Sequence, residues 1–293
     1  MQAQDMSPHK ILPALALPPD ALRQAFVAAF ADYLIGPFEP TPEQWPAFLQ
    51  RQGVDLSLSR AALRVGLDEQ TGVELLAFAL VAPRPELGRW RLATMGALPA
   101  ARGSGAAPAL LDDFVQRAAA QGQAAVELEV FAQNQRALRL YQSRGFVARH
   151  ELHGYLAEPG RIGGLDHPVH EIARPADALD WLQEQAPPDL PLQVSPPILR
   201  QSALHTWRWG RAQLMFALPD VHSLQISSLL DVSGPAQRDA RVLLQTLAAR
   251  YPQRTLRVPA LQRPELGGEA LRELGFERQG LHQLWMLRDL SVG

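Results

Sequence analysis

Apolar residues near the start of the chain recur at helical spacing. Over residues 19–34 they lie three or four positions apart and follow Asp20, a residue type that caps helices. An amphipathic helix is therefore predicted there. A second helix is predicted after Thr41, where a capping residue and a proline precede Trp45 and Phe48 at helical spacing.

The pattern then changes to short apolar or β-branched runs bounded by Asp, Gly and Pro, which is typical of strands. These runs predict a three-stranded meander, over 61–65, 74–81 and 89–98. Helices and strands alternate after it: a helix over 108–120, a strand over 125–131, a helix over 134–144 stopped by Gly145, and a strand over 146–156. The first half is thus predicted to be a mixed α/β or α+β domain.

Residues 158–168 are rich in Gly and Pro, as in exposed connections between domains. The elements predicted beyond them repeat the order of the first half: a helix over 176–185, extended segments over 200–208, 212–218 and 223–232, a helix over 237–251, a strand over 255–261, a helix over 266–274 and a strand over 276–287. The segment 169–173 could close the first sheet or open the second.

The ends of the two halves are similar in sequence. The segment 140–146, LYQSRGF, corresponds to 270–276, ALRELGF, and Gly145 and Gly275 are 130 residues apart, a domain-sized offset. Duplication of one domain explains this simply. Two tandem domains, 1–160 and 168–293, are therefore predicted, each a twisted mixed sheet flanked by helices.

Composition narrows the functional classes. The 293 residues are 47% hydrophobic and carry a net charge of −2 without long runs of like charge, so nucleic acid is not an expected partner. No window approaches 18 uninterrupted apolar residues, and residues 1–19 lack the basic region and cleavage site of a signal peptide. The chain has no cysteine, which excludes disulfides and an acyl-cysteine intermediate. A cytoplasmic protein without a membrane span is expected.

The most informative segment is a glycine-rich turn from a strand into a helix, over residues 98–111. Gly103 and Gly105 permit backbone conformations and close approaches that a side chain would block, while successive N–H groups and the helix N-terminus face a negative ligand. Pro108 lies in the first helical turn, where its missing N–H costs nothing. The spacing fits neither a dinucleotide fingerprint nor a P-loop.

The segment Arg102-Gly103-Ser104-Gly105-Ala106-Ala107 has the spacing Arg/Gln-x-x-Gly-x-Gly/Ala and resembles the pyrophosphate-binding motif of the GNAT superfamily of N-acetyltransferases. A second block, from Leu128-Glu129-Val130 through Asn134 to Gly145-Phe146, resembles that family's following strand and helix. Two motifs in the right order are more specific than one. The resemblance covers about residues 61–156, and the two leading helices also fit it.

The resemblance implies that acetyl-CoA lies between the strand ending at Leu98 and the strand over 127–130. Its pantetheine arm would bond to the backbone of that first strand, and its pyrophosphate would bind the motif's N–H groups. Asn134 would contact the pantetheine, and Tyr141, near the sulfur, would protonate the departing thiolate. The implied cofactor-binding residues are Met95, Gly96, Ala97, Leu98, Arg102, Gly103, Ser104, Gly105, Ala106, Ala107, Pro108, Asn134 and Tyr141. Without the resemblance, Tyr141 would simply be a core residue of an amphipathic helix.

A base must also take the proton from the attacking ammonium. Strand alternation places Glu127 and Glu129 on one face, where neighbouring carboxylates would raise each other's pKa. The family's strand pattern favours Glu129, directly or through a water, with Glu127 second. The alternatives are that both glutamates lie on a solvated face and that only waters relay the proton.

Other chemistry-bearing groups have simpler interpretations. Asp166, His167 and His170 have metal-ligand side chains but lie in a predicted connection broken by proline, so a solvated loop is expected and no metal is required. Trp207 and Trp209 are expected on a strand with one buried face. The aromatic residues of the first helix are expected in the core, although that family's first two helices line the acceptor site. Asp32, Tyr33 and Glu43 could therefore contact substrate.

The second half departs from the motif. Pro235 removes an N–H that the cradle would need, and the positions of Asn134, Tyr141 and Glu129 correspond to Pro264, Leu271 and Pro259. The second domain is therefore predicted to keep the fold without cofactor binding or catalysis.

The resemblance implies an acetyl-CoA-dependent N-acetyltransferase acting on a primary amine of a small molecule or a peptide. Two alternatives stay open: a non-catalytic CoA-binding sensor or scaffold, and an enzyme that uses a longer acyl donor. The acceptor's identity and the oligomeric state are not predicted.

Overall fold

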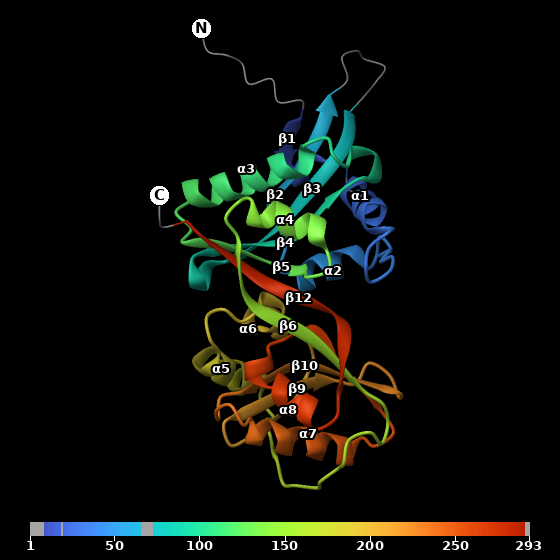
Figure 1. Ribbon diagram of the computed structural model, residues 1–293, viewed down its shortest axis with the longest axis vertical. Coiled ribbons are helices and arrows are strands. Elements are labelled where there is room, and N and C mark those ends of the chain that lie inside the picture. The colour runs from blue at the N-terminus through green and yellow to red at the C-terminus, as the bar shows by residue number, and fades with distance from the viewer. Residues whose placement is uncertain (1–8, 19, 66–72, 291–293) are drawn as a thin grey trace. The chain divides into compact units, whose positions relative to one another are not determined.

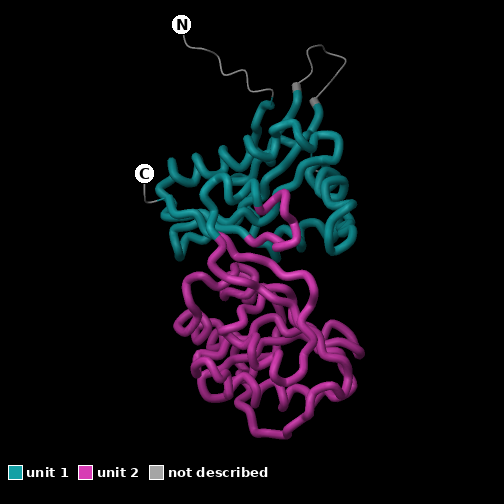
Figure 2. Tube along the Cα trace, in the orientation of Figure 1, with its two compact units in different colours: residues 1–128, 139–147, 287–293 teal, residues 129–138, 148–286 magenta. Residues whose placement is uncertain are grey.

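The computed structural model describes residues 9–18, 20–65 and 73–290. These residues divide into two compact units, shown in two colours in Figure 2. The first unit contains the chain up to residue 128, residues 139–147 and the C-terminal end from 287. The second contains residues 129–138 and 148–286.

The helices and strands predicted for the first half are present (Figure 1). They are α1 (Ala21–Phe30), α2 (Trp45–Arg51), β2 (Asp55–Val65), β3 (Val73–Arg84), β4 (Arg89–Ala97), α3 (Ala106–Ala120), β5 (Ala125–Phe131), α4 (Gln135–Gln142) and β6 (Val147–Ala157), with 3-10 turns over Ala14–Ala16, Pro85–Leu87 and Pro99–Ala101. The sequence did not predict strand β1 (Lys10–Pro13), which pairs antiparallel with β2.

In the first unit, β1, β2, β3 and β4 form consecutive antiparallel pairs, and β5 joins β4 in parallel. Phe78 and Leu80 of β3 pack in one core with α1 and Trp45 of α2. Helix α3 packs on β2, β3 and β4, with Phe114 beside Trp90 at a ring-centroid distance of 6.3 Å. The mixed sheet is thus flanked by helices.

The second half contains β7 (His170–Glu171), α5 (Pro175–Gln185), α6 (Pro196–Leu199), β8 (His205–Trp209), β9 (Ala212–Ala217), β10 (Ser223–Asp231), α7 (Arg238–Arg250), β11 (Thr255–Gln262), α8 (Gly268–Glu273) and β12 (Glu277–Asp289), with 3-10 turns over Leu192–Val194 and Pro264–Leu266. The prediction of an extended segment from residue 200 was wrong at its start. The paired prolines Pro196 and Pro197 begin α6 instead, and the strand starts only at His205.

The sheet of the second unit repeats the pairing of the first. Strands β7, β8, β9 and β10 are consecutive antiparallel neighbours, and β11 joins β10 in parallel. Its core gathers Phe216, Leu224 and Ile226 of the sheet with Leu243 and Leu247 of α7. Because β7 pairs with β8, the segment around residues 169–173 belongs to the second sheet.

Strands β6 and β12 do not stay with the half of the chain in which they occur. Strand β6 pairs antiparallel with β11, and all of it except Val147 belongs to the second unit. The end of β12 belongs to the first unit, where Leu290 N–H donates to the carbonyl oxygen of Ala124 at 2.9 Å. The two compact units therefore interleave along the sequence, and the duplicated domains 1–160 and 168–293 stay a prediction.

Two classes of feature are absent from the part of the chain that the structure describes. None of its helices has the length and apolar composition that a membrane crossing requires. None of its His, Asp and Glu side chains gather in threes in a way that could hold a metal ion.

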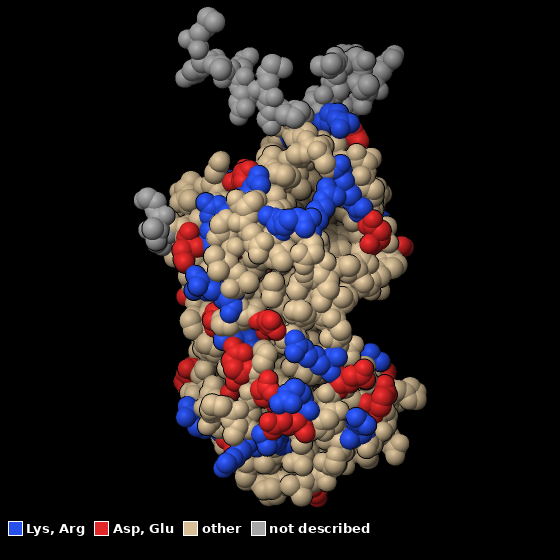
Figure 3. All heavy atoms as spheres, in the orientation of Figure 1, with Lys and Arg blue, Asp and Glu red and all other residues tan. Residues whose placement is uncertain are grey.

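On the visible face of the second unit, acidic and basic side chains are intermixed rather than gathered by sign (Figure 3).

Candidate active site

The turn between β4 and α3 requires glycine at two positions. Gly103 and Gly105 have φ angles of +88° and +89°, in the left-handed region that L side chains rarely adopt. Gly105 is also the N-cap of α3, and nothing lies within 4 Å of a Cβ placed on Gly103. The two glycines thus set the path by which the chain enters the helix.

The same turn presents unbonded donors. Within the described residues, the backbone N–H groups of Gly103, Gly105 and Ala107 donate no hydrogen bond, whereas the Ala106 N–H donates to Ser104 Oγ at 3.3 Å. Pro108 has no N–H. Three free N–H groups at the positive end of a 15-residue helix form a site for an anion.

Arg102 has an anchoring role that the motif alone does not reveal. Its guanidinium donates to both carboxylate oxygens of Asp32, at 2.5 and 2.6 Å, and to the carbonyl oxygen of Ala29 at 3.3 Å. The hydrogen bond from Arg102 lowers the pKa of Asp32. Arg102 therefore ties the turn to the end of α1.

His9 supports the turn from the other side, and sequence reasoning missed it. Its Nε2 lies 2.8 Å from the carbonyl oxygen of Ser104, so this nitrogen carries the proton and donates. A single histidine before a short strand offers no sequence signal that could have identified this contact.

Strand β4 separates from β5 just before the turn. The parallel ladder runs from Arg89 and Ala125 to Leu92 and Leu128 and ends there. A register shift opposite Leu80 and Val81 leaves Ala93 as an extra residue in β4, which is a β-bulge. Residues 94–97, which include Met95 to Ala97, pair with β3, and Leu98 N–H donates to Leu76 at 2.9 Å.

Gly96 is required by a close approach of α1. A Cβ at this position would lie 2.9 Å from both the Ala29 Cβ and the Phe78 ring, nearer than real Cβ atoms come. Helix α1 therefore packs tightly against this part of β4.

Tyr141 lies on the inner face of α4 and is 7% exposed. Its ring packs against Phe146 at 5.9 Å, and its carbonyl oxygen accepts hydrogen bonds from the N–H groups of Arg144 and Phe146. Burial, and to a lesser extent the phenol of Tyr33, raise the pKa of Tyr141 well above its usual range. Tyr141 therefore keeps its proton at neutral pH.

Glu127 is fully buried and held by two cations. Arg84 Nη1 lies 2.7 Å from its Oε1, and Arg89 Nη1 lies 3.5 Å from its Oε2. Arg84 is the last residue of β3, and Arg89 is the first residue of β4, which pairs with β5. Glu127 is thus the acidic partner in a buried ion pair within the sheet.

Glu129, two residues along the same strand, is partly buried. Its Oε2 accepts a hydrogen bond of 3.4 Å from Nε2 of Gln193, a residue in the 3-10 turn between α5 and α6. The two glutamates therefore have different partners. Sequence reasoning missed Gln193, because 64 residues separate it from Glu129 and no motif marks it.

Asn134 caps α4. Its Oδ1 accepts from the Ala137 N–H at 3.2 Å, and its Nδ2 donates no hydrogen bond in the described part of the chain. The helix begins at the next residue. Asn134 therefore has a structural role and retains a free amide donor.

The second half fills the corresponding anion position with its own side chain. Asp231, 2% exposed at the end of β10, accepts from the N–H groups of Ser233 at 2.6 Å and of Ala240, in the first turn of α7, at 2.8 Å. Gln237 reaches α8, where its Oε1 accepts from the Ala270 N–H at 2.9 Å. These donors are therefore already satisfied.

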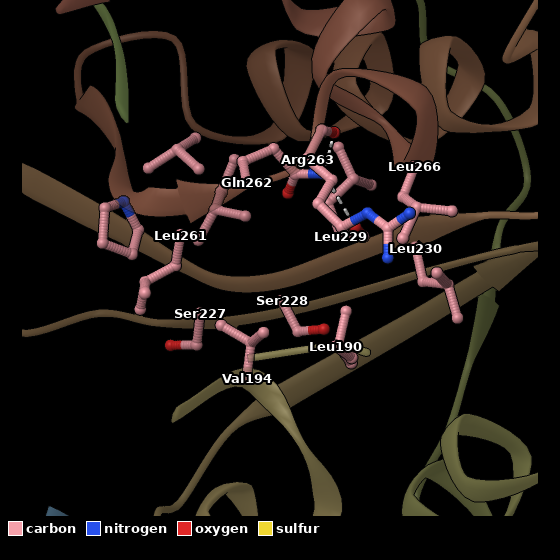
Figure 4. Close-up of a pocket in the computed structure, with 13 residues that line it drawn as sticks. Leu190, Val194, Ser227, Ser228, Leu229, Leu230, Leu261, Gln262, Arg263 and Leu266 are labelled. Carbon is pink, nitrogen blue, oxygen red and sulfur yellow. Dashed lines mark hydrogen bonds between the residues drawn. The ribbon is translucent and has the colours of Figure 1, made fainter. Parts of the chain in front are cut away.

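The groove between β10 and β11 is also filled. The parallel ladder ends at Gln225 and Arg257, as the β4–β5 ladder ends at Leu92 and Leu128. Leu190 and Val194 line the groove beyond it (Figure 4) and leave a cavity of about 10 Å³, the lower limit for one water molecule. Pro259, at the position equivalent to Glu129, also lines it.

Comparison with known proteins identifies the first half. Residues 24–146 match the family model of the acetyltransferase (GNAT) family, and this span contains the glycine turn, Glu129 and Tyr141. These residues form a GNAT acetyltransferase domain. No curated protein matches the chain.

Solved structures extend the likeness to the whole chain at the level of the fold. A GCN5-related N-acetyltransferase from Sphaerobacter thermophilus is 14% identical with a TM-score of 0.67, over 98% of this chain and 97% of that one. One from Anabaena variabilis is 17% identical with a TM-score of 0.63, over 97% and 73%. A putative acetyltransferase from Pyrococcus horikoshii is 14% identical with a TM-score of 0.62, over 99% and 92%. The GNAT domain is thus part of a larger fold shared with these proteins.

The remaining candidates lie in structural positions. Trp207 is buried in the second core, and His167 packs edge-on against Trp209 at 4.2 Å. Phe26 lies in the first core, and Phe30 packs against it and against Tyr33. Glu43 accepts a hydrogen bond from the Thr41 hydroxyl.

Proposed function

We propose that the chain transfers the acetyl group of acetyl-CoA to a primary amine of a small molecule or a peptide, in the predicted domain 1–160. The observation that carries the proposal is the left-handed turn at Gly103 and Gly105, with unbonded N–H groups at the start of α3. Such a site binds an anion. In the GNAT family this motif binds the pyrophosphate of CoA.

The thioester would lie along the part of β4 that no longer pairs with β5. The bulge at Ala93 and the end of the β4–β5 ladder at Leu92 leave this strand's backbone available to the pantetheine arm. The N–H of Ala97 is our candidate for stabilising the oxyanion of the tetrahedral intermediate. The free Nδ2 of Asn134 is our candidate donor to the pantetheine.

The reaction needs a base and an acid. We assign the base to Glu129, directly or through a water, because Glu127 is already neutralised by Arg84. Glu129 takes a proton from the acceptor ammonium, and the neutral nitrogen attacks the thioester carbon. As the C–N bond forms and the C–S bond breaks, the Tyr141 hydroxyl gives its proton to the CoA thiolate. The acylated nitrogen gives its second proton to the Tyr141 phenolate, so the products are an amide, CoA and the proton held by Glu129.

The second predicted domain, 168–293, would not bind CoA. Asp231 holds a carboxylate at the start of α7, where a phosphate would have to bind, and Leu190 and Val194 line the groove that a pantetheine would need. One molecule of acetyl-CoA per chain is therefore expected.

The test is to incubate the protein with acetyl-CoA and a panel of primary amines and to detect acetylated products by mass spectrometry. Competition with longer acyl-CoAs measures donor preference. Acetylated amines formed only with active protein support the proposal. Tight CoA binding with no product would favour a sensor or scaffold, and preferential transfer of a longer chain would favour another acyl donor.

A further inference from the structure

The segment between α5 and α6 makes two different contacts at once. Leu190 and Val194 line the groove of the second half, and both are 8% exposed, while Leu192 is 2% exposed. Gln193, between two buried neighbours, contacts Glu129 of β5. The segment that carries Leu190 and Val194 therefore also fixes the position of Gln193.

The backbone of Gln193 is held in place. The N–H groups of Val194 and Ser195 donate to the carbonyl oxygens of Pro191 and Leu192 at 3.1 Å, and the Ser195 hydroxyl donates to Leu192 at 2.6 Å. Upstream, Asp189 accepts from Arg263 at 2.5 Å and is in contact with the His150 ring. The segment is thus anchored on both sides of Gln193.

The amide of Gln193 has a defined orientation. A carboxylate only accepts hydrogen bonds, so Nε2 must face Glu129 and Oε1 must face away. Oε1 is covered and forms no hydrogen bond in the described residues. A covered polar atom without a partner is uncommon in native proteins and calls for an explanation.

We propose that Gln193 is a positioning residue of the acetyltransferase site: its Nε2 orients Glu129, and its Oε1 accepts a hydrogen bond from the acceptor amine. This inference rests on the proposed function. A primary ammonium has three N–H donors, so it can donate to Gln193 while another of its protons goes to Glu129.

The variant that tests this is Gln193→Met, which keeps the length of the side chain and removes both polar atoms. With an amine that the wild type acetylates, kcat/KM should fall about ten- to hundredfold, through a higher KM for the amine and a lower kcat. The Kd for CoA and the thermal midpoint should not change. Gln201→Met is the matched control, because Gln201 is exposed and, within the described residues, its amide bonds only to Pro197.

A double-mutant cycle separates positioning from a structural effect. In a Glu129→Gln background, Gln193→Met should cost much less than in the wild type, because the carboxylate it orients is gone. Equal losses in both backgrounds, or wild-type kinetics for Gln193→Met, would overturn this inference and leave the proposed function intact. If the protein binds CoA but neither acetylates nor binds any primary amine in calorimetry, both the function and the inference fail.

Discussion

The carboxylate of Asp231 accepts a hydrogen bond from the N–H of Ala240, in the first turn of α7. In the first turn of α3, in the first half, the N–H of Ala107 donates to no group among the described residues. The start of α7 therefore has a carboxylate of the chain beside it, and the start of α3 keeps an N–H donor that a ligand can use.

Replacing Asp231 should affect stability and not CoA binding. Asp231→Ala removes the acceptor for two N–H groups and should lower the free energy of unfolding by about 1–2 kcal/mol. Denaturant unfolding measures this, and calorimetry should still find one CoA per chain. A second equivalent of CoA in the variant would show that Asp231 alone blocks the second site.

Replacing Gly105 should weaken CoA binding. Gly105→Ala places a Cβ on a left-handed residue, which costs about 1–2 kcal/mol, and displaces the N–H groups of the turn. The Kd for CoA should rise about tenfold or more. Gly122→Ala is the matched control, because Gly122 is also left-handed but follows the far end of α3. Equal effects on the Kd would argue against the assigned turn.

The two glutamates of β5 should respond differently to loss of charge. Glu127→Gln leaves Arg84 buried beside a neutral partner, so the free energy of unfolding should fall by about 3 kcal/mol. Glu129→Gln should preserve stability and lower kcat/KM about a hundredfold. Unfolding curves and initial rates for both variants measure these effects. The reverse result would transfer the role of base to Glu127 or to water.

Tyr141 should remain a proton donor at alkaline pH. Burial raises its pKa above the ordinary value of 10.0, so the acid is fully protonated up to that pH. We expect no decline of kcat/KM below about pH 10. The pKa of Tyr141 is higher in the folded chain than in the unfolded chain. The stability that its protonated hydroxyl contributes is therefore complete below pH 10 and is lost above it. Tyr141→Phe should reduce this alkaline loss of stability, and an unchanged loss would contradict the burial argument.

His153 should make the protein sensitive to acid. Burial, followed by the charge of Arg278, lowers the pKa of its ring below the ordinary value of 6.5. A lowered folded-state pKa gives a contribution to stability that is complete above about pH 6.5 and is lost as the pH falls. His153→Gln should flatten the decrease in unfolding free energy below that pH, compared with the wild type. Identical slopes would contradict the assignment.

Local signals predicted most of the fold. Thr41, the capping residue predicted before α2, exchanges hydrogen bonds with Gln44: Thr41 N–H donates to Gln44 Oε1 at 3.0 Å, and Gln44 N–H donates to Thr41 Oγ1 at 3.3 Å. The helix starts only at Trp45, and its N-cap is Gln44. Strand β1 was missed because Lys10–Pro13 is short and ends in proline, and only its pairing with β2 defines it. Almost all of β6 belongs to the second unit, and the end of β12 belongs to the first. These placements depend on tertiary packing, which no local sequence pattern encodes.

The candidate site was predictable where the chemistry depends on backbone conformation. The glycine spacing correctly indicated the left-handed turn. Alternation placed Glu127 and Glu129 on one face but could not show that two arginines hold the first and Gln193 contacts the second. Those partners come from other strands and from a distant turn, so only the folded chain brings them together.

The most direct test of the central claim is the initial rate of thiol release from acetyl-CoA with a primary amine, compared between the wild type and Tyr141→Phe. We predict amine-dependent release that the substitution lowers about a hundredfold, with the Kd for CoA unchanged. Equal rates for the two proteins would contradict the assignment of Tyr141. No amine-dependent release by the wild type would contradict the acetyltransferase itself.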